Sequence, residues 1–126
     1  MKQLLLVGIG GFFGSIARYL VSKLNISWSF HDIPMGTFTA NVIGSLIIGF
    51  LMGILVDANG LNNNLRLLLA VGFCGGFTTF SSFTNENLHL LQNGQYLTAF
   101  IYILGSVALG IVAVFVGYLI STAFRH

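Results

Sequence analysis

Four long apolar stretches, separated by short polar connections, dominate this sequence of 126 residues. They occupy residues 4–22, 36–56, 65–91 and 97–124. An α-helix needs about 20 apolar residues to cross a lipid bilayer, and each stretch is of that order. Only 6% of the residues are charged, whereas a soluble domain carries about 25%. We therefore expect an all-α integral membrane protein, with four transmembrane helices in a single domain over residues 1–126.

The few charged residues are spread almost evenly between the two expected sides of the membrane. With four crossings, Lys2, Arg66 and Arg125 share one side, and Lys23 lies on the other with Arg18 near the end of the first stretch. An excess of Lys and Arg sets the orientation of a membrane protein. Three basic residues on one side and two on the other leave open whether the chain has a fixed topology or inserts in both orientations. This charge is also too sparse for a nucleic-acid partner.

The third stretch contains a segment that disfavours a continuous helix. Residues 72–83 bring Gly75 and Gly76 together, and the β-branched pair Thr78 and Thr79 follows. A glycine inside a helix costs roughly 0.5–1 kcal/mol relative to alanine. We expect this helix to be interrupted in mid-membrane near residues 75–80, and a kinked but continuous helix is the alternative. An interruption would free carbonyl oxygens for a cation and present a helix N-terminus to an anion.

Polar and small residues form a stripe along the second stretch. They recur every four residues, which places them on one helix face: Thr37, Asn41, Ser45, Gly49 and Gly53. Small residues let helices approach closely, so helix packing explains Ser45, Gly49 and Gly53. Asn41 fits an interhelical hydrogen bond and a pore contact equally well. In the middle of the fourth stretch, Ser106 offers a hydroxyl to a permeant ion.

Two charged residues in the expected helices have open roles. Gly10, Gly14 and Arg18 are spaced four apart, which fits a close helix crossing at the glycines. Arg18 then serves as an anchor at the membrane interface or contributes to a vestibule that attracts anions. Glu86 and His89, near the end of the third stretch, are expected to be solvated at the interface, with a proton relay as the alternative. Glu86 is also a candidate for the same vestibule as Arg18.

Phe80 and Phe83 lie three residues apart, on one face of the helix expected after the interruption. The edge of a phenylalanine ring carries partial positive charge, so two rings turned edge-on can face a small anion. Without further context, packing is the commoner role of such a pair.

Three segments make the chain similar to the Fluc fluoride channel family, also called CrcB. They are residues 10–19 (GGFFGSIARY), residues 36–45 with Asn41 and the Gly44-Ser45 pair, and residues 75–83 (GGFTTFSSF). The third segment is highly specific, and the chain length also fits. The fourth stretch matches mainly in length and at Ser106.

This resemblance implies a dual-topology homodimer of two inverted copies in the bacterial plasma (inner) membrane, a multi-pass protein that lets fluoride leave the cytoplasm passively. It implies two parallel pores and a structural sodium ion at the dimer centre, held by the main-chain carbonyls of Gly75 and Thr78. The pore residues expected on this basis are Asn41, Thr79, Phe80, Phe83 and Ser106. Some family members continue a ladder of hydroxyls along the fourth helix, where this chain has Gly110 and Val114.

Two other function classes compete with an ion channel. A small four-helix proton-coupled multidrug exporter can also form inverted dimers, but it needs a carboxylate within the membrane, and the first stretch has none. An assembly subunit without transport would use its small-residue stripes only for packing. An enzyme is not expected, because no nucleophile–base pair or metal-ligand cluster is recognisable.

Overall fold

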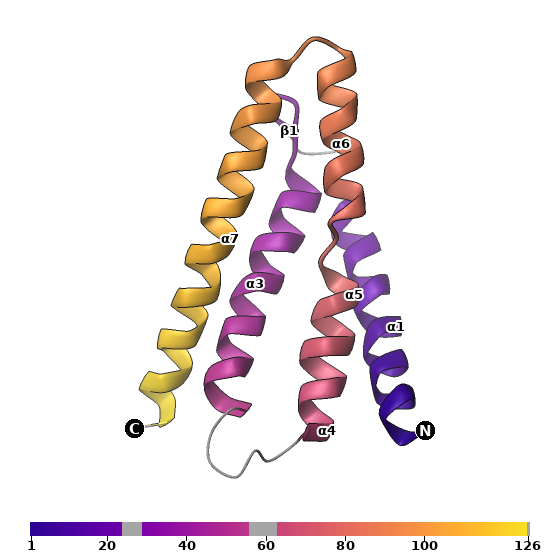
Figure 1. Cartoon of the computed structure of the whole chain (residues 1–126), viewed down its shortest axis with the longest axis vertical. Coiled ribbons are helices and arrows are strands. Elements are labelled where there is room, and N and C mark those ends of the chain that lie inside the picture. The colour runs from indigo at the N-terminus through magenta and orange to yellow at the C-terminus, as the bar shows by residue number, and fades with distance from the viewer. Residues whose placement is uncertain (24–28, 56–62, 126) are drawn as a thin grey trace.

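Four helical spans build the molecule, described in a computed structural model over residues 1–23, 29–55 and 63–125. They are α1 (Lys2–Ser22), α3 (Met35–Leu55), a third span over Asn63–Gln92, and α7 (Tyr96–Arg125). Each is long and apolar enough to cross a membrane, so the prediction of an all-α protein with four such helices is confirmed. The boundaries lie within two residues of the predicted ranges. Both chain termini lie at one end of the bundle (Figure 1).

The third span is built from several segments. It begins with α4 (Asn63–Leu65), continues as the π-helix η2 (Arg66–Cys74) and ends its first half with α5 (Gly75–Phe77). The helix then breaks, because Thr78 has the extended backbone angles φ −89° and ψ 159°. α6 (Ser81–Gln92) resumes the span (Figure 1). The break falls within the range expected from the Gly75–Gly76 pair, whereas the π-helical part has no signal in the sequence.

Glycines bring α1 into close contact with the first half of the third span. A Cβ atom on Gly10 would overlap the Leu68 carbonyl oxygen, and one on Gly14 would overlap the carbonyl oxygen of Phe73. The close crossing expected from the spacing of these two glycines is therefore confirmed. α1 lies beside η2 and α5 (Figure 1).

α3 and α7 pack together through a second set of small residues. A Cβ on Gly49 would overlap the Val114 carbonyl oxygen, and one on Gly117 would overlap the carbonyl oxygen of Leu46. A Cβ on Gly53 would overlap the Ser121 hydroxyl of α7 and would lie 3.2 Å from the Tyr118 carbonyl oxygen. The packing role expected of Gly49 and Gly53 is confirmed. Since lipid is as apolar as leucine, such close backbone contact is a main source of helix association in a bilayer.

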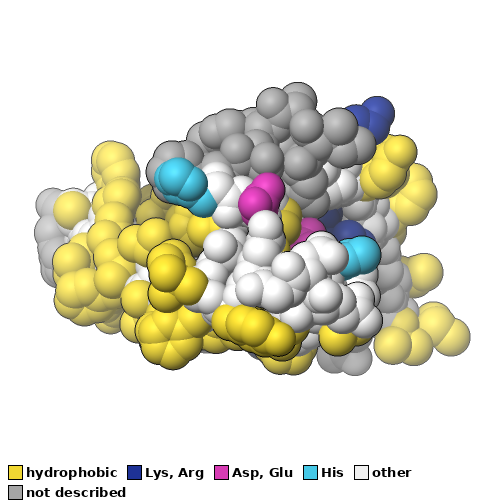
Figure 2. Space-filling model, turned by 90° about the horizontal axis from the view of Figure 1, so that it is seen from above, with side chains coloured by type: hydrophobic (Ala, Val, Ile, Leu, Met, Phe, Trp, Pro, Cys, Tyr) yellow, Lys and Arg dark blue, Asp and Glu magenta, His cyan; other side chains and the backbone are white. Residues whose placement is uncertain are grey.

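A short hairpin lies near the end of the bundle opposite the termini, beside α3 and α7 (Figure 1). Strands β1 (Ser29–Phe30) and β2 (Ile33–Pro34) pair antiparallel, with positive φ angles at His31 and Asp32 between them. The Gln95 side-chain amide donates to Oδ2 of Asp32 at 2.9 Å and ties this turn to the one before α7. Viewed from above, this end shows acidic and histidine side chains among polar atoms, with hydrophobic side chains around them (Figure 2).

Candidate functional site

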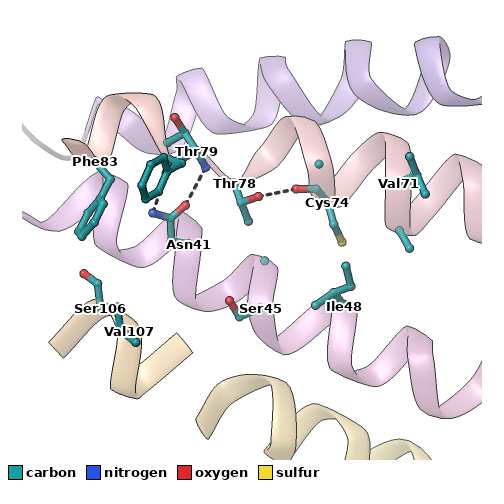
Figure 3. A pocket seen from close by; sticks show the side chains of 14 residues that line it. Asn41, Ser45, Ile48, Val71, Cys74, Thr78, Thr79, Phe83, Ser106 and Val107 are labelled. Carbon is teal, nitrogen blue, oxygen red and sulfur yellow. Dashed lines mark hydrogen bonds between the residues drawn. The ribbon is translucent and has the colours of Figure 1, made fainter. Parts of the chain in front are cut away.

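An open pocket of about 470 Å³ lies between α3, the broken third span and α7. It brings together all seven residues that the resemblance assigns to the pore and the cation: Asn41, Gly75, Thr78, Thr79, Phe80, Phe83 and Ser106. They come from α3, the third span and α7, which are distant in the sequence. Figure 3 shows the side chains of Asn41, Thr78, Thr79, Phe83 and Ser106 around one space. The 14 residues that line the pocket include no charged side chain.

Asn41 holds the backbone at the helix break. Its Oδ1 accepts a hydrogen bond from the Thr79 N–H at 2.8 Å, and its Nδ2 donates to the Thr79 carbonyl oxygen at 3.1 Å (Figure 3). The carboxamide therefore satisfies both polar groups of a residue that has left the helix. One amide proton remains for another acceptor, since the group carries two. Of the two roles the sequence left open, the structure contains the interhelical hydrogen bond.

The break removes the helical donors of two carbonyl groups. In a continuous α-helix the Thr79 N–H would bond the Gly75 carbonyl, but here it bonds Asn41 instead. The Ser82 N–H would likewise bond the Thr78 carbonyl, but it donates to Oγ1 of Thr79 at 3.1 Å. The carbonyls of Gly75 and Thr78 thus lose their donors beside the pocket. They are the two oxygens that the resemblance assigns to sodium.

The two phenylalanines occupy different environments although their rings are neighbours. Their centroids lie 6.1 Å apart with a tilt of 41°. Phe80 is 76% exposed, whereas Phe83 is 9% exposed and packs edge-on against Tyr102 at 4.9 Å. Phe83 thus belongs to a hydrophobic cluster as well as to the pocket wall, and Phe80 is the ring that projects from the surface of the chain.

Hydroxyl groups from α3 and α7 extend the pocket. Oγ of Ser106 is buried and, among the described residues, has no hydrogen-bond partner. Ser45 also lines the pocket, one helical turn from Asn41 (Figure 3). Its Oγ lies 3.6 Å from the place that a Cβ on Gly110 would take. At the level where α7 lacks a hydroxyl, α3 therefore supplies one.

Arg18 lies outside this pocket. Its Nε donates to the Gly76 carbonyl oxygen at 3.0 Å, and the side chain is partly buried. The sequence predicted an anchor or a vestibule residue, and neither interpretation anticipated a contact with the break. The only feature of the sequence that pointed toward this contact was the four-residue spacing, which places Arg18 after Gly10 and Gly14 on one face of α1.

Glu86 is also outside this pocket. Its Oε2 accepts a hydrogen bond from the Thr37 hydroxyl at 2.6 Å, and its Oε1 accepts one from the Tyr102 hydroxyl at 2.8 Å. Glu86 is half-buried, and buried hydroxyls of α3 and α7 bind both of its oxygens, which the expectation of a solvated carboxylate did not include. Glu86 also borders a second pocket of about 410 Å³ at the hairpin end, with Asp32 and His89. Thr37 was visible in the sequence as a member of the α3 stripe, without a signal for its partner.

Sequence comparison places the chain among proteins of known families. The family model described as CrcB-like protein, Camphor Resistance (CrcB), matches residues 5–118. A protein of Gloeothece citriformis is 49% identical over 96% of this chain and 98% of its own length. Proteins of Phocaeicola vulgatus (46% identical, 96% and 99% covered) and Azobacteroides pseudotrichonymphae (43%, 98% and 99%) are similar over the same extent. All three are named fluoride-specific ion channel FluC.

Proposed function

The chain belongs to the CrcB-like protein family, and on that premise we propose that it is a fluoride-selective channel through which fluoride leaves the cytoplasm passively. It is a multi-pass bacterial membrane protein with four helices that are long and apolar enough to cross a membrane. The observation that carries the proposal is the pocket at the helix break, which combines an amide, a free hydroxyl and an aromatic ring without any charged side chain. An ion channel is not an enzyme, so no residue is assigned a catalytic role.

Neutral donors suit an anion that must enter and leave quickly. An anion that leaves water needs compensating contacts, because an unpaired charge in an apolar medium is prohibitive. The remaining amide proton of Asn41, the unpartnered hydroxyl of Ser106 and the ring edge of Phe80 offer partial positive charge. A fixed cation would hold the ion too tightly, and conduction requires binding that is weak enough for release.

Ser45 provides the next contact along the path. The hydroxyl of Ser106 is followed on α7 by Gly110, which offers no donor. Because the Ser45 hydroxyl lies beside Gly110, it takes over this step from α3. Thr79 contributes to the path by its hydroxyl, since Asn41 engages both of its backbone polar groups. The hydroxyl oxygen accepts from the Ser82 N–H, and this bond does not use the hydroxyl proton.

The channel unit we propose is a homodimer of two inverted copies, with two pores and a sodium ion at its centre. Gly75 is exposed, and Phe80 projects 76% exposed, beside the break, so this face is available to a second copy. A two-fold axis would bring the Gly75 and Thr78 carbonyls of both copies together, and unwound carbonyls are suitable sodium ligands. The near balance of basic residues supports insertion in both orientations.

The proposed cation has a direct structural test. An experimental density map of the dimer should contain one ion on the two-fold axis, with main-chain oxygen ligands only. A peak with the geometry of water, or one that persists when sodium is absent from the medium, would refute the sodium assignment without affecting the proposed fluoride pathway.

The multidrug exporter is not favoured. Proton-coupled export needs a carboxylate that is available within the membrane, and Glu86, within the third span, has both oxygens engaged by the Thr37 and Tyr102 hydroxyls. The relatives, moreover, are named as ion channels.

Efflux from liposomes tests the function. The purified protein is reconstituted into liposomes loaded with potassium fluoride or potassium chloride, and valinomycin carries the counter-ion. We expect fluoride to leave and chloride to stay. Comparable chloride efflux would refute selectivity, and absence of fluoride efflux would refute the proposed function. Uptake of an organic cation driven by a proton gradient would restore the exporter.

A further inference from the structure

Arg18 is a charged residue on an apolar helix, and the pocket does not account for it. The pocket is lined by residues of α3, the third span and α7, and none comes from α1. The guanidinium therefore does not face the proposed anion path. Its Nε instead donates at 3.0 Å to the carbonyl oxygen of Gly76, two residues before the break.

The packing of α1 brings Arg18 to this place. Gly14 lies one turn earlier, where a Cβ would be 3.0 Å from the Phe77 nitrogen. Gly76 is equally close from the other side, because a Cβ there would be 2.8 Å from the Gly11 carbonyl oxygen and 3.1 Å from Oγ of Ser15. Glycines on α1 and α5 thus let the two backbones pack in close contact at the level of the break. This backbone contact determines the position of Arg18 relative to Gly76.

The Gly76 carbonyl needs a donor because of the break. In a continuous α-helix it would accept from the Phe80 N–H, which the extended Thr78 moves away. It also lies at the C-terminal end of the half-helix formed by η2 and α5, where the helix dipole places partial negative charge. Arg18 supplies both a donor and a positive charge at this end.

We propose that Arg18 is a positioning residue that fixes the end of the first half-helix and thereby orients the Gly75 and Thr78 carbonyls on the opposite, pocket side. Three of the carbonyls at this end are then divided between two cations. Gly76 turns toward the guanidinium on α1, and Gly75 and Thr78 are left for the sodium ion. This inference rests on the proposed function, because it assigns Arg18 a role toward the central cation of the channel.

A series of substitutions at Arg18 separates the contribution of its hydrogen-bond donor from that of its positive charge. Arg18→Lys keeps the charge and a donor, Arg18→Gln keeps a donor alone, and Arg18→Met keeps neither at similar length. Lys23→Gln is the matched control, since Lys23 is an exposed cation next to the same helix. The thermal unfolding midpoint of the purified dimer is measured against sodium concentration, with N-methylglucamine as the replacement cation, and fluoride efflux is measured in parallel.

We expect the sodium concentration for half of the thermal stabilisation to rise at least tenfold in Arg18→Met, less in Arg18→Gln and least in Arg18→Lys, with fluoride efflux falling in the same order. Lys23→Gln should behave as wild type. A uniformly lower midpoint with unchanged sodium dependence would make Arg18 a simple anchor and overturn the inference.

The outcomes also separate this inference from the proposed function. Wild-type protein that neither conducts fluoride nor responds to sodium would overturn both. Sodium-dependent, fluoride-conducting wild type with unchanged variants would overturn only the role of Arg18. If Arg18→Met does not fold, the comparison of Arg18→Lys with Arg18→Gln decides, because equal sodium dependence in these two and in wild type refutes the inference.

Discussion

Replacement of Asn41 by aspartate changes one group of the carboxamide and tests its role in the proposed path. Asn41→Asp keeps the acceptor that binds the Thr79 N–H at 2.8 Å. The second oxygen, however, takes the place of Nδ2 and stands about 3.1 Å from the Thr79 carbonyl oxygen, where the donor was before. The variant therefore keeps the size of the side chain, loses one hydrogen bond and gains a negative charge beside the anion path.

The charge dominates the expected effect. Two unit charges about 4 Å apart repel by about 4 kcal/mol at an effective dielectric constant of about 20. Since about 1.4 kcal/mol corresponds to a factor of ten in rate, fluoride efflux should fall by about three orders of magnitude. The lost hydrogen bond and the facing oxygens add a smaller destabilisation of about 1–3 kcal/mol, visible as a lower unfolding midpoint.

Asn63→Asp is the matched control. Asn63 is exposed at the start of α4, and its Oδ1 accepts from Arg66, so aspartate preserves that contact and adds the same charge. We expect efflux from this control within twofold of wild type. The reasoning is refuted if Asn41→Asp forms the dimer and conducts fluoride within tenfold of wild type in the liposome assay.

Three further predictions concern packing and the pocket wall. Phe80→Ile should nearly abolish fluoride efflux while the dimer persists, because the ring edge is lost from the path. Phe83→Ile should in addition lower the free energy of unfolding by about 1 kcal/mol or more, because Phe83 is 9% exposed and packs against Tyr102; unchanged stability of Phe83→Ile would contradict this. Gly117→Ala should prevent a stable fold, because its Cβ overlaps a carbonyl of α3, while Gly105→Ala has open space and should elute from size-exclusion chromatography as wild type. Glu86→Gln should cost about 1–3 kcal/mol in a denaturation assay, since an amide nitrogen replaces one of two acceptors; unchanged stability would argue against the buried network.

The helices and their packing faces follow from the sequence because they depend on local properties. Span length and apolar character set the four helices, and the four-residue spacing of Gly10 with Gly14 sets a close crossing. The Gly75–Gly76 pair marks the break for the same reason, since the cost of glycine in a helix is local. Patterns of this kind need no knowledge of the neighbouring helix.

Contacts between distant segments could not be predicted in this way. Nothing in the sequence around Glu86 shows that the hydroxyls of Thr37 and Tyr102 donate to it, because the three residues come from different helices. The hydrogen bond from Arg18 to Gly76 joins residues 58 positions apart. The Gly76 carbonyl is available to Arg18 only because the break removes its helical donor, the Phe80 N–H. The residues of the pocket were named from the family resemblance, and the structure adds that they meet in one space.

The interruption of the third span places two helix ends of opposite polarity a few residues apart. The half that ends at Phe77 offers electron-rich oxygens, and the half that begins at Ser81 offers electron-poor amides. Under the proposed function, one irregular stretch of backbone then attracts a positive ion on one flank and a negative ion on the other. A substitution that changes the backbone of this stretch must therefore alter the affinity for the anion and the affinity for the cation together. Halide selectivity cannot evolve at this position independently of the dependence on an alkali-metal ion.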